Sequence, residues 1–318
     1  MHNFDNPIKI GFLLIPGFAL MSYASAIEPL RAANHIASKE LYSLSNISIK
    51  SAGAVCSTGY EISCSTSIEN TKPLDFLFVC AGGNPFAFGN QKVFTWLRSL
   101  AATGVTLGGV SGGPVILAKA NVITGRRVAV HWEHEEAMRE TFPDAMIEHS
   151  LYIFDRKRIT CAGGVAPMDM MHALIGEHHG APFAKKISDW FLHTAVRPPG
   201  AAQRMGIAEN YGVTNPAVLH AIEYMQNQMS TAPPLRKIAT YSGISERQLG
   251  RLFKEEIGVS AAHFFRKMRL NYAARLLRQS TMSVTEIGYA AGFSSGAHFS
   301  KCFSTEFGKT PISVRKKT

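Results

Sequence analysis

Two related stretches decide the fold of this chain, namely IATYSGIS at positions 238–245 and IGYAAGFS at positions 287–294. In each, a short helical pattern ends at a Gly turn, and a Ser after the turn can cap a second helix. Matching positions of the two copies lie 49 or 50 residues apart. This arrangement is typical of a helix-turn-helix, and its repetition predicts an all-α region that contains two such motifs.

The second helix of each motif is expected to be amphipathic. Spacings of three and four residues give it an apolar back, formed by Leu249, Leu252 and Phe253 in the first copy and by Phe299, Cys302 and Phe303 in the second. The front carries Arg or Lys and suits the major groove of DNA. An ordinary bundle of solvated helices is the alternative, which the repeat disfavours. We therefore expect DNA contacts at Ser245, Arg247, Gln248, Arg251, Lys254, Ser295, Ala297, Ser300 and Lys301.

The two reading helices differ in charge. Arg247 and Arg251 predict that the first helix reads bases, whereas Lys301 predicts a phosphate contact and shape reading by the second. Between the motifs, residues 261–279 form one long helical pattern, which would hold the two helices roughly one turn of DNA apart. Its expected core side consists of Phe265, Met268, Tyr272 and Leu276.

The positive charge of the chain is concentrated in its last third. The 318 residues include 33 Lys and Arg and 23 Asp and Glu, of which 15 and 6, respectively, lie between Pro216 and Thr318. The basic balance therefore belongs to the C-terminal region, where it favours double-stranded DNA as a partner.

The first two thirds of the chain alternate strand and helix patterns. Strands are expected at 8–15, 47–49, 74–80, 105–110 and 128–130, with a strand pair within 152–161. Helices are expected at 21–34, 93–103, 115–120, 134–141 and 166–179. This alternation predicts a flavodoxin-like α/β domain, in which helices cover both faces of a parallel sheet.

Pro and Gly residues interrupt every pattern between Arg197 and Tyr211. They predict a first domain at 1–196, a linker at 197–214 and a DNA-binding domain at 215–318. A length of 318 residues is typical of two domains.

Cysteine usage and the N-terminus indicate the cytoplasm. The five cysteines are an odd number without a CxxC pair, which favours free thiols and a reducing compartment. Residues 24–26 resemble a signal-peptide cleavage site, but Asp5 and the Pro16-Gly17 break argue against a signal peptide. No stretch is long and apolar enough to cross a bilayer, so we expect no membrane partner.

Several segments of the chain resemble known families. RLNYAARLL at 269–277, IGYAAGF at 287–293 and residues 303–311 are similar to the AraC/XylS DNA-binding domain. LIPGF at 14–18, CAGG at 80–83, GVSGG at 109–113, GRR at 125–127 and HW at 131–132 resemble the PfpI type of class I glutamine-amidotransferase-like domain. The combination resembles the GlxA family of transcriptional regulators, and LMSYASAIEPLR at 20–31 is similar to regulators of glycine betaine and carnitine catabolism.

The same resemblance bears on catalysis. GVSGG at 109–113 fits the G-x-S-x-G elbow that presents a nucleophile at a strand end, but an unaided Ser needs an adjacent base. Amidotransferase-like relatives hold Cys at the position of Ser111, often His at Gly112, and an acid near Ser22. We therefore expect no enzyme activity and no cofactor. The alternatives are a serine hydrolase or amidotransferase with a DNA-targeting tail, and a Gly-rich turn without any ligand.

The elbow can serve instead as a binding pocket, because ligands of open parallel sheets lie beyond the C-terminal strand ends. Backbone N–H groups at a helix start suit a carboxylate. Trp132 either packs in the core or offers its face to a quaternary ammonium, with Glu133 balancing the charge. We expect a small-molecule effector, a quaternary amine such as glycine betaine or carnitine, at Gly82, Gly83, Asn84, Ser111, Gly112, His131, Trp132 and Glu133.

Three other groups carry weaker predictions. His131 with His134, and the run 177–179, have the spacing of metal ligands without a third ligand, so we expect no metal. Asp169 is interpreted as a structural charge at a helix start.

Together these features predict a cytoplasmic transcriptional regulator. We expect a homodimer that binds operator DNA, acts on RNA polymerase as an activator, and responds to its effector through the linker. The rival is a constitutive DNA-binding protein whose N-terminal domain only dimerises.

Overall fold

A computed structural model of the protein describes residues 6–50, 53–280 and 282–315. It divides into two compact units, Met1–Gln203 and Arg204–Thr318. The division falls inside the 197–214 segment that the sequence predicts as a linker. Within the described ranges, no helix has the length and apolarity to span a membrane.

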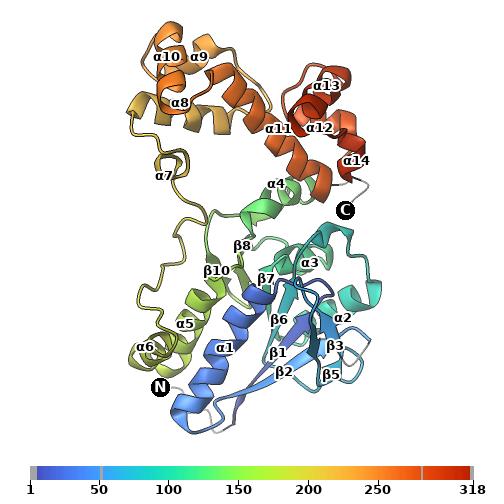
Figure 1. Ribbon diagram of the computed structural model, residues 1–318. Helices are drawn as coiled ribbons and strands as arrows, with labels where there is room; N and C mark the ends of the chain where they lie inside the picture. Colours follow the sequence, from blue (N-terminus) through green and yellow to red (C-terminus); the bar gives the residue numbers. More distant parts are fainter. Residues whose placement is uncertain (1–5, 51–52, 281, 316–318) are drawn as a thin grey trace. The chain divides into compact units, whose positions relative to one another are not determined.

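A seven-stranded sheet forms the centre of the first unit (Figure 1), in the order β10-β11-β7-β6-β1-β2-β5. Neighbours run parallel except β10 and β11, which are antiparallel. The strands are β1 (Ile8–Leu14), β2 (Tyr42–Ser48), β5 (Thr66–Ser67), β6 (Phe76–Ala81), β7 (Thr106–Ser111), β10 (Tyr152–Asp155) and β11 (Arg158–Cys161). The predicted α/β class is confirmed.

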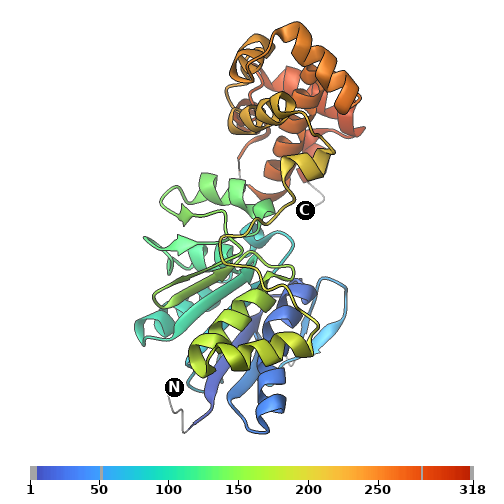
Figure 2. The same cartoon turned by 90° about the vertical axis from the view of Figure 1, so that its left-hand side faces the viewer.

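Helices cover both faces of this sheet (Figures 1 and 2). One face carries α1 (Leu20–Ala37), α5 (Ala166–His179) and α6 (Ala181–Trp190), and the other carries α2 (Gln91–Ala102) and α3 (Gly113–Lys119). On β1, Ile10, Phe12 and Leu14 belong to the core beneath α1 and α5, and the alternate residue Leu13 is also fully buried. Because both faces are covered, the strand has a continuous apolar sequence rather than an alternating one.

Two strands differ from the sequence prediction. Strand β2 begins at Tyr42 rather than at residue 47, because the Asn34 side chain accepts the N–H groups of Leu41 and Tyr42 and aligns the chain with β1. The Ser and Asn residues of β2 conceal its strand pattern. The short strand expected at 128–130 is β8 (Arg127–Val128), where Val128 is followed by a turn into α4 (Trp132–Thr141).

Short elements that the sequence did not predict complete the first unit. They are the hairpin β3 (Gly53–Val55) and β4 (Glu61–Ser63), the strand β9 (Met146–Ile147) beside β8, the 3-10 helix η1 (Pro85–Ala87), and helix α6. Each is shorter than the window over which hydrophobic periodicity is legible, or lacks it altogether.

The second unit is all α-helical, as predicted. Its helices are α7 (Ile207–Tyr211), α8 (Pro216–Asn227), α9 (Leu235–Tyr241), α10 (Glu246–Glu256), α11 (Ala261–Gln279), α12 (Val284–Ala290), α13 (Gly296–Phe307) and α14 (Pro311–Arg315). The pairs α9–α10 and α12–α13 are the two helix-turn-helix motifs, each with a left-handed Gly in its turn, Gly243 and Gly292.

Helix α11 has a wider buried surface than the sequence predicts. Phe265 and Leu276 are buried as expected, whereas Met268 and Tyr272 are only partly buried. Residues outside the predicted stripe are buried as well, namely Phe264, Leu270, Ala273, Ala274 and Leu277. The reason is that α11 contacts α10 along its first part and α12, α13 and α14 elsewhere, so it has partners on more than one side.

Candidate functional site

Ser111 occupies a strained turn at the C-terminal end of β7. Its φ is +59°, a left-handed conformation that non-Gly residues rarely adopt. The turn is tight because α3 starts two residues later, and a side chain at Gly113 would strike the carbonyl oxygen of Val79. Such strain at the end of a central strand is typical of a functional position. The G-x-S-x-G elbow that the sequence predicts is therefore present in the backbone.

The segment at Gly163 and Gly164 meets both Ser111 and Ser22, and no sequence pattern connected this segment with the elbow. Gly163 lies so close that a Cβ on it would be 2.7 Å from Ser111 Cβ and 3.0 Å from Ser22 Oγ. Next to it, the Gly164 N–H donates to Ser22 Oγ at 2.8 Å. Ser111 and Ser22 are both buried. The sequence feature that could have indicated this contact is the pair Gly163-Gly164, which follows the apolar strand β11 as the pair Gly82-Gly83 follows β6.

The loop after β6 lies against this elbow. A Cβ on Gly82 would be 2.8 Å from both Gly17 O and Ala19 N, so Gly82 serves the close approach of two loops. Gly83 is left-handed and has open space around it. The Gly112 N–H donates to Ala81 O at 3.1 Å. This N–H group, which we expected to bind a ligand carboxylate, is therefore already engaged within the protein. Asn84 precedes η1, and Pro85 lies beside Gly112.

His131 is the N-cap residue of helix α4. Its Nδ1 accepts the Glu133 N–H at 3.2 Å, which caps the helix. Burial lowers the pKa of His131 below its ordinary value, and the neighbouring His134 lowers it further. The His134 ring contacts the Phe86 ring with centroids 6.3 Å apart, so α4 is joined to the loop after β6.

Trp132 is half-buried beside His131. The two ring centroids are 5.2 Å apart and tilted, so His131 covers part of the indole. The backbone N–H of Trp132 donates to Gln203 Oε1 at 2.8 Å, and Gln203 Nε2 donates to Val130 O and Ser150 O. Gln203 lies in the segment predicted as a linker, and no sequence signal indicated its role.

Residues 193–203 are bound to the first unit around Asp169, which is fully buried. Arg197 donates to its carboxylate through the backbone N–H at 2.9 Å and through Nε and Nη2 at 3.0 and 2.6 Å. His193 Nε2 lies 2.8 Å from Asp169 Oδ1. Further on, Pro199 O accepts the Leu151 N–H at 2.7 Å. Asp169 thus anchors the chain that leads to the second unit.

The first reading helix, α10, exposes all five of its predicted DNA contacts. Ser245 and Gln248 form a capping box, in which each side chain bonds the backbone N–H of the other. Arg247, Arg251 and Lys254 are exposed. Of the predicted back, Leu249 and Phe253 are buried, whereas Leu252 is only half-buried.

The second reading helix, α13, has the same construction with less charge. Ser295 caps it by accepting the His298 N–H at 3.2 Å. Ala297 and Lys301 are exposed, and Ser300 is half-buried. Of the predicted back, Phe299 and Phe303 are buried, whereas Cys302 is only half-buried.

The pairs of histidines do not gather into a metal centre. Within the described ranges, no group of three or more His, Cys, Asp or Glu side chains is placed to hold a metal ion. His178 and His179 instead pack against the Tyr42 ring, with centroids 5.9 and 5.4 Å apart.

Comparison with protein families assigns both units. Residues 8–177 match the DJ-1/PfpI family, and residues 238–317 match a helix-turn-helix domain. The second range begins at Ile238, where the sequence repeat begins.

Relatives of full length carry the same combination. The chain is 42% identical over 314 residues to the HTH-type transcriptional regulator GlxA of Rhizobium meliloti, covering 98% of this chain and 97% of that protein. It is 37% identical over 306 residues to the regulator CdhR of Pseudomonas aeruginosa, covering 96% and 90%. It is 36% identical over 311 residues to the regulator GbdR of the same species, covering 98% and 85%.

Solved structures share the fold of the first unit. An AraC family transcriptional regulator from Pseudomonas putida aligns with a TM-score of 0.54 at 24% identity, covering 58% of this chain and all of that one. The oxidized DJ-1 of Toxoplasma gondii aligns with a TM-score of 0.50 at 16% identity, covering 59% and all of that chain.

Proposed function

The chain belongs to the AraC-family transcriptional regulators with a DJ-1/PfpI domain, and we propose that it responds to a small metabolite bound at the Ser111 elbow. The observation that carries this proposal is the strained Ser111, near which Ser22 of α1, the loop after β6 and the Gly163–Gly164 segment before α5 converge. Strain of this kind persists where the surrounding structure maintains it, and it is common at ligand sites.

The effector that we propose is a quaternary amine with a carboxylate, such as glycine betaine or carnitine. Because the Gly112 N–H is engaged with Ala81, we assign the carboxylate to the Ser111 hydroxyl. The uncovered part of the Trp132 indole would attract the ammonium by about 0.5–2 kcal/mol, with Glu133 beside it as a counter-charge. The proposed site also includes residues from the loop after β6 and the N-cap of α4, namely Gly82, Gly83, Asn84 and His131.

We propose that this domain binds its ligand without turning it over. Ser22 stands where amidotransferase-like relatives have an acid, and it bonds the Gly164 N–H rather than a nucleophile. Ser111 packs against Gly163. Hydrolysis of ester or amide substrates that is abolished by Ser111→Ala would support the alternative, a serine hydrolase with a DNA-targeting tail.

The response that we propose is activation of transcription by a cytoplasmic homodimer. The exposed faces of α10 and α13 would bind operator DNA and allow contact with RNA polymerase. A ligand can change DNA binding only if its affinity differs between two arrangements of the protein. Helix α5 connects the Ser111 elbow with the contact between Asp169 and Arg197. Gly163 and Gly164, at the elbow, lie just before this helix, and Asp169, which holds Arg197, lies within it.

Calorimetry with glycine betaine and carnitine tests the effector site. We expect Trp132→Ala to weaken binding about tenfold, as loss of a cation–π contact would. Ser111→Trp should abolish binding by filling the elbow. Unchanged affinity in both variants would remove the proposal. A thermal-shift screen that also contains amino acids and nucleosides would then identify another input through stabilisation.

A further inference from the structure

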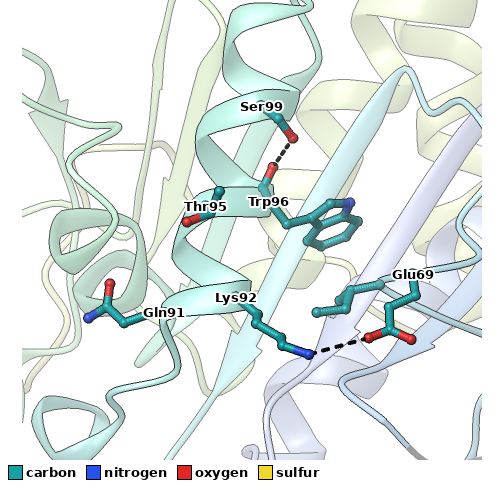
Figure 3. A pocket seen from close by; sticks show the side chains of 7 residues that line it. Glu69, Gln91, Lys92, Thr95, Trp96 and Ser99 are labelled. Atoms are coloured by element: carbon teal, nitrogen blue, oxygen red, sulfur yellow. Dashed lines mark hydrogen bonds and ion pairs between the residues drawn. The ribbon is translucent and has the colours of Figure 1, made fainter.

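A hollow of about 460 Å³ lies between α2 and the segment that follows β5 (Figure 3). Glu69 lines it from that segment, and residues on one stripe of α2 line it opposite, including Lys92, Thr95 and Trp96. The volume lies within the range of small-molecule sites. None of these residues belongs to the elbow or to the reading helices.

Trp96 gives the hollow an aromatic wall. Helix α2 is anchored to the sheet by Val93, Phe94 and Leu97, which are all buried, whereas Trp96 is half-buried. Figure 3 shows the Trp96 indole and the Lys92 side chain extending from α2 on the same side, the side on which Glu69 lies. An aromatic wall beside a carboxylate is the environment that attracts an organic cation.

Glu69 and Lys92 place one charge of each sign at the mouth of the hollow. Lys92 Nζ and Glu69 Oε1 are 3.8 Å apart, with the side chains 74% and 67% exposed. This distance is longer than a hydrogen bond, and solvent screens an exposed pair so that it contributes little. The two groups can therefore separate at small cost and bind the two ends of a ligand.

We propose that this hollow is a second small-molecule site, which takes a zwitterion with an apolar cationic head. The cationic head lies against the Trp96 indole beside Glu69, and the ligand carboxylate pairs with Lys92. Both charges of the ligand are then matched, which a neutral ligand or a simple cation would not achieve. The inference is independent of the proposed elbow site, because Ser111 and Trp132 take no part in it.

Calorimetric titration of the intact chain with glycine betaine tests the site. Two probes are matched to it: 3,3-dimethylbutanoate replaces the cationic nitrogen by carbon, and choline replaces the carboxylate by a hydroxyl. We expect Trp96→Leu to weaken one binding event about tenfold, and 3,3-dimethylbutanoate to bind there about tenfold more weakly than glycine betaine. Lys92→Gln should weaken glycine betaine binding and leave choline binding unchanged.

The control variant is Trp132→Leu, which should leave the Trp96-dependent event unchanged. Because Lys92 and Glu69 are exposed, Lys92→Gln and Glu69→Gln test the site without disturbing the core. The inference is overturned if glycine betaine shows no Trp96-dependent binding at millimolar concentrations, or if all binding depends on Trp132. It is also overturned if 3,3-dimethylbutanoate binds as tightly as glycine betaine, because the cationic charge would then be irrelevant.

Discussion

Arg197 donates three hydrogen bonds to the buried carboxylate of Asp169, from its backbone N–H, Nε and Nη2. This contact fixes the point from which the chain continues toward the second unit. The two charged side chains differ in burial: the Asp169 side chain is fully buried, whereas the Arg197 side chain is 37% exposed. Loss of the arginine side chain would therefore leave a buried negative charge, with His193 Nε2 still 2.8 Å from Asp169 Oδ1.

We expect Arg197→Ala to lower the free energy of unfolding of the first unit by about 3 kcal/mol, because it leaves a buried charge poorly compensated. Hydrogen exchange should also quicken at the Leu151 N–H, which is bonded to Pro199 beyond the anchor. Urea denaturation and exchange measurements check the two effects. Lys186→Ala, which removes an exposed charge from α6 of the same unit, is the control, and an equal loss of stability from both variants would contradict the anchoring role.

The same anchor predicts a loss of ligand response. If Asp169 transmits the state of the elbow to residue 197, Asp169→Asn should reduce the effect of the effector on operator affinity while leaving effector binding itself largely intact. The measurement is operator binding with and without effector by fluorescence anisotropy. A normal effector response in a folded Asp169→Asn protein would exclude this route of communication.

The two reading helices should respond differently to loss of charge. We expect Arg251→Ala to cost about 1–3 kcal/mol on the preferred operator and to relax base preference at one position. Lys301→Ala should weaken binding to all sequences about equally and reduce the salt slope by about one. Competition binding over an operator library at several salt concentrations separates the outcomes. An equal loss of specificity in both variants would show that the helices read DNA alike.

Gly163 and Gly164 offer a matched pair at the elbow. Both have positive φ, +99° and +61°, but only Gly163 is crowded by Ser111 and Ser22. Gly164→Ala should cost about 1–2 kcal/mol for the left-handed backbone alone. Gly163→Ala should cost about 1–3 kcal/mol more because the new methyl displaces Ser111, and it should weaken effector binding. Equal unfolding free energies for the two variants would mean that Ser111 moves away from the new methyl group at no measurable cost, which would contradict the prediction.

The stability of the first unit should fall as the solution becomes acidic. Burial lowers the pKa of His131, His172 and His179 in the folded protein, so the unfolded chain takes up protons first. Stability is therefore retained above the ordinary His pKa of about 6.5 and lost as the pH falls through it toward the folded values. Thermal melts across this range test the slope. In His131→Asn, which keeps a capping side chain, the decline should be shallower.

Elements with a long periodic pattern were predictable from sequence. The helices at 166–179 and 261–279 have the bounds that the sequence predicts, because Pro167 and Gly180 mark the two ends of the first helix and the Ser260 cap starts the second. The central strands were legible for a similar reason, since burial on both faces makes them continuously apolar. The Gly-x-Ser-x-Gly pattern likewise indicated the strained Ser111 correctly.

Contacts between distant segments were not predictable in this way. Ser22 and Gly164 are 142 positions apart, and Trp132 and Gln203 are 71 apart, so no local pattern records that they meet. The sequence predicts Asp169 as a structural charge at the start of a helix. Its hydrogen bonds with Arg197 form only when α5 and the segment that follows α6 pack together.

The sequence by itself determined the class of each unit, the two helix-turn-helix motifs and the family, because these depend on patterns that repeat within one element. The tertiary structure alone decided which residues surround Ser111, how residues 193–203 are held, and where the Trp96 hollow lies. The physical reason is that backbone hydrogen bonding and amphipathic spacing act over a few residues, whereas a site forms only where strands and loops far apart in the chain are brought into contact by burial of a common core.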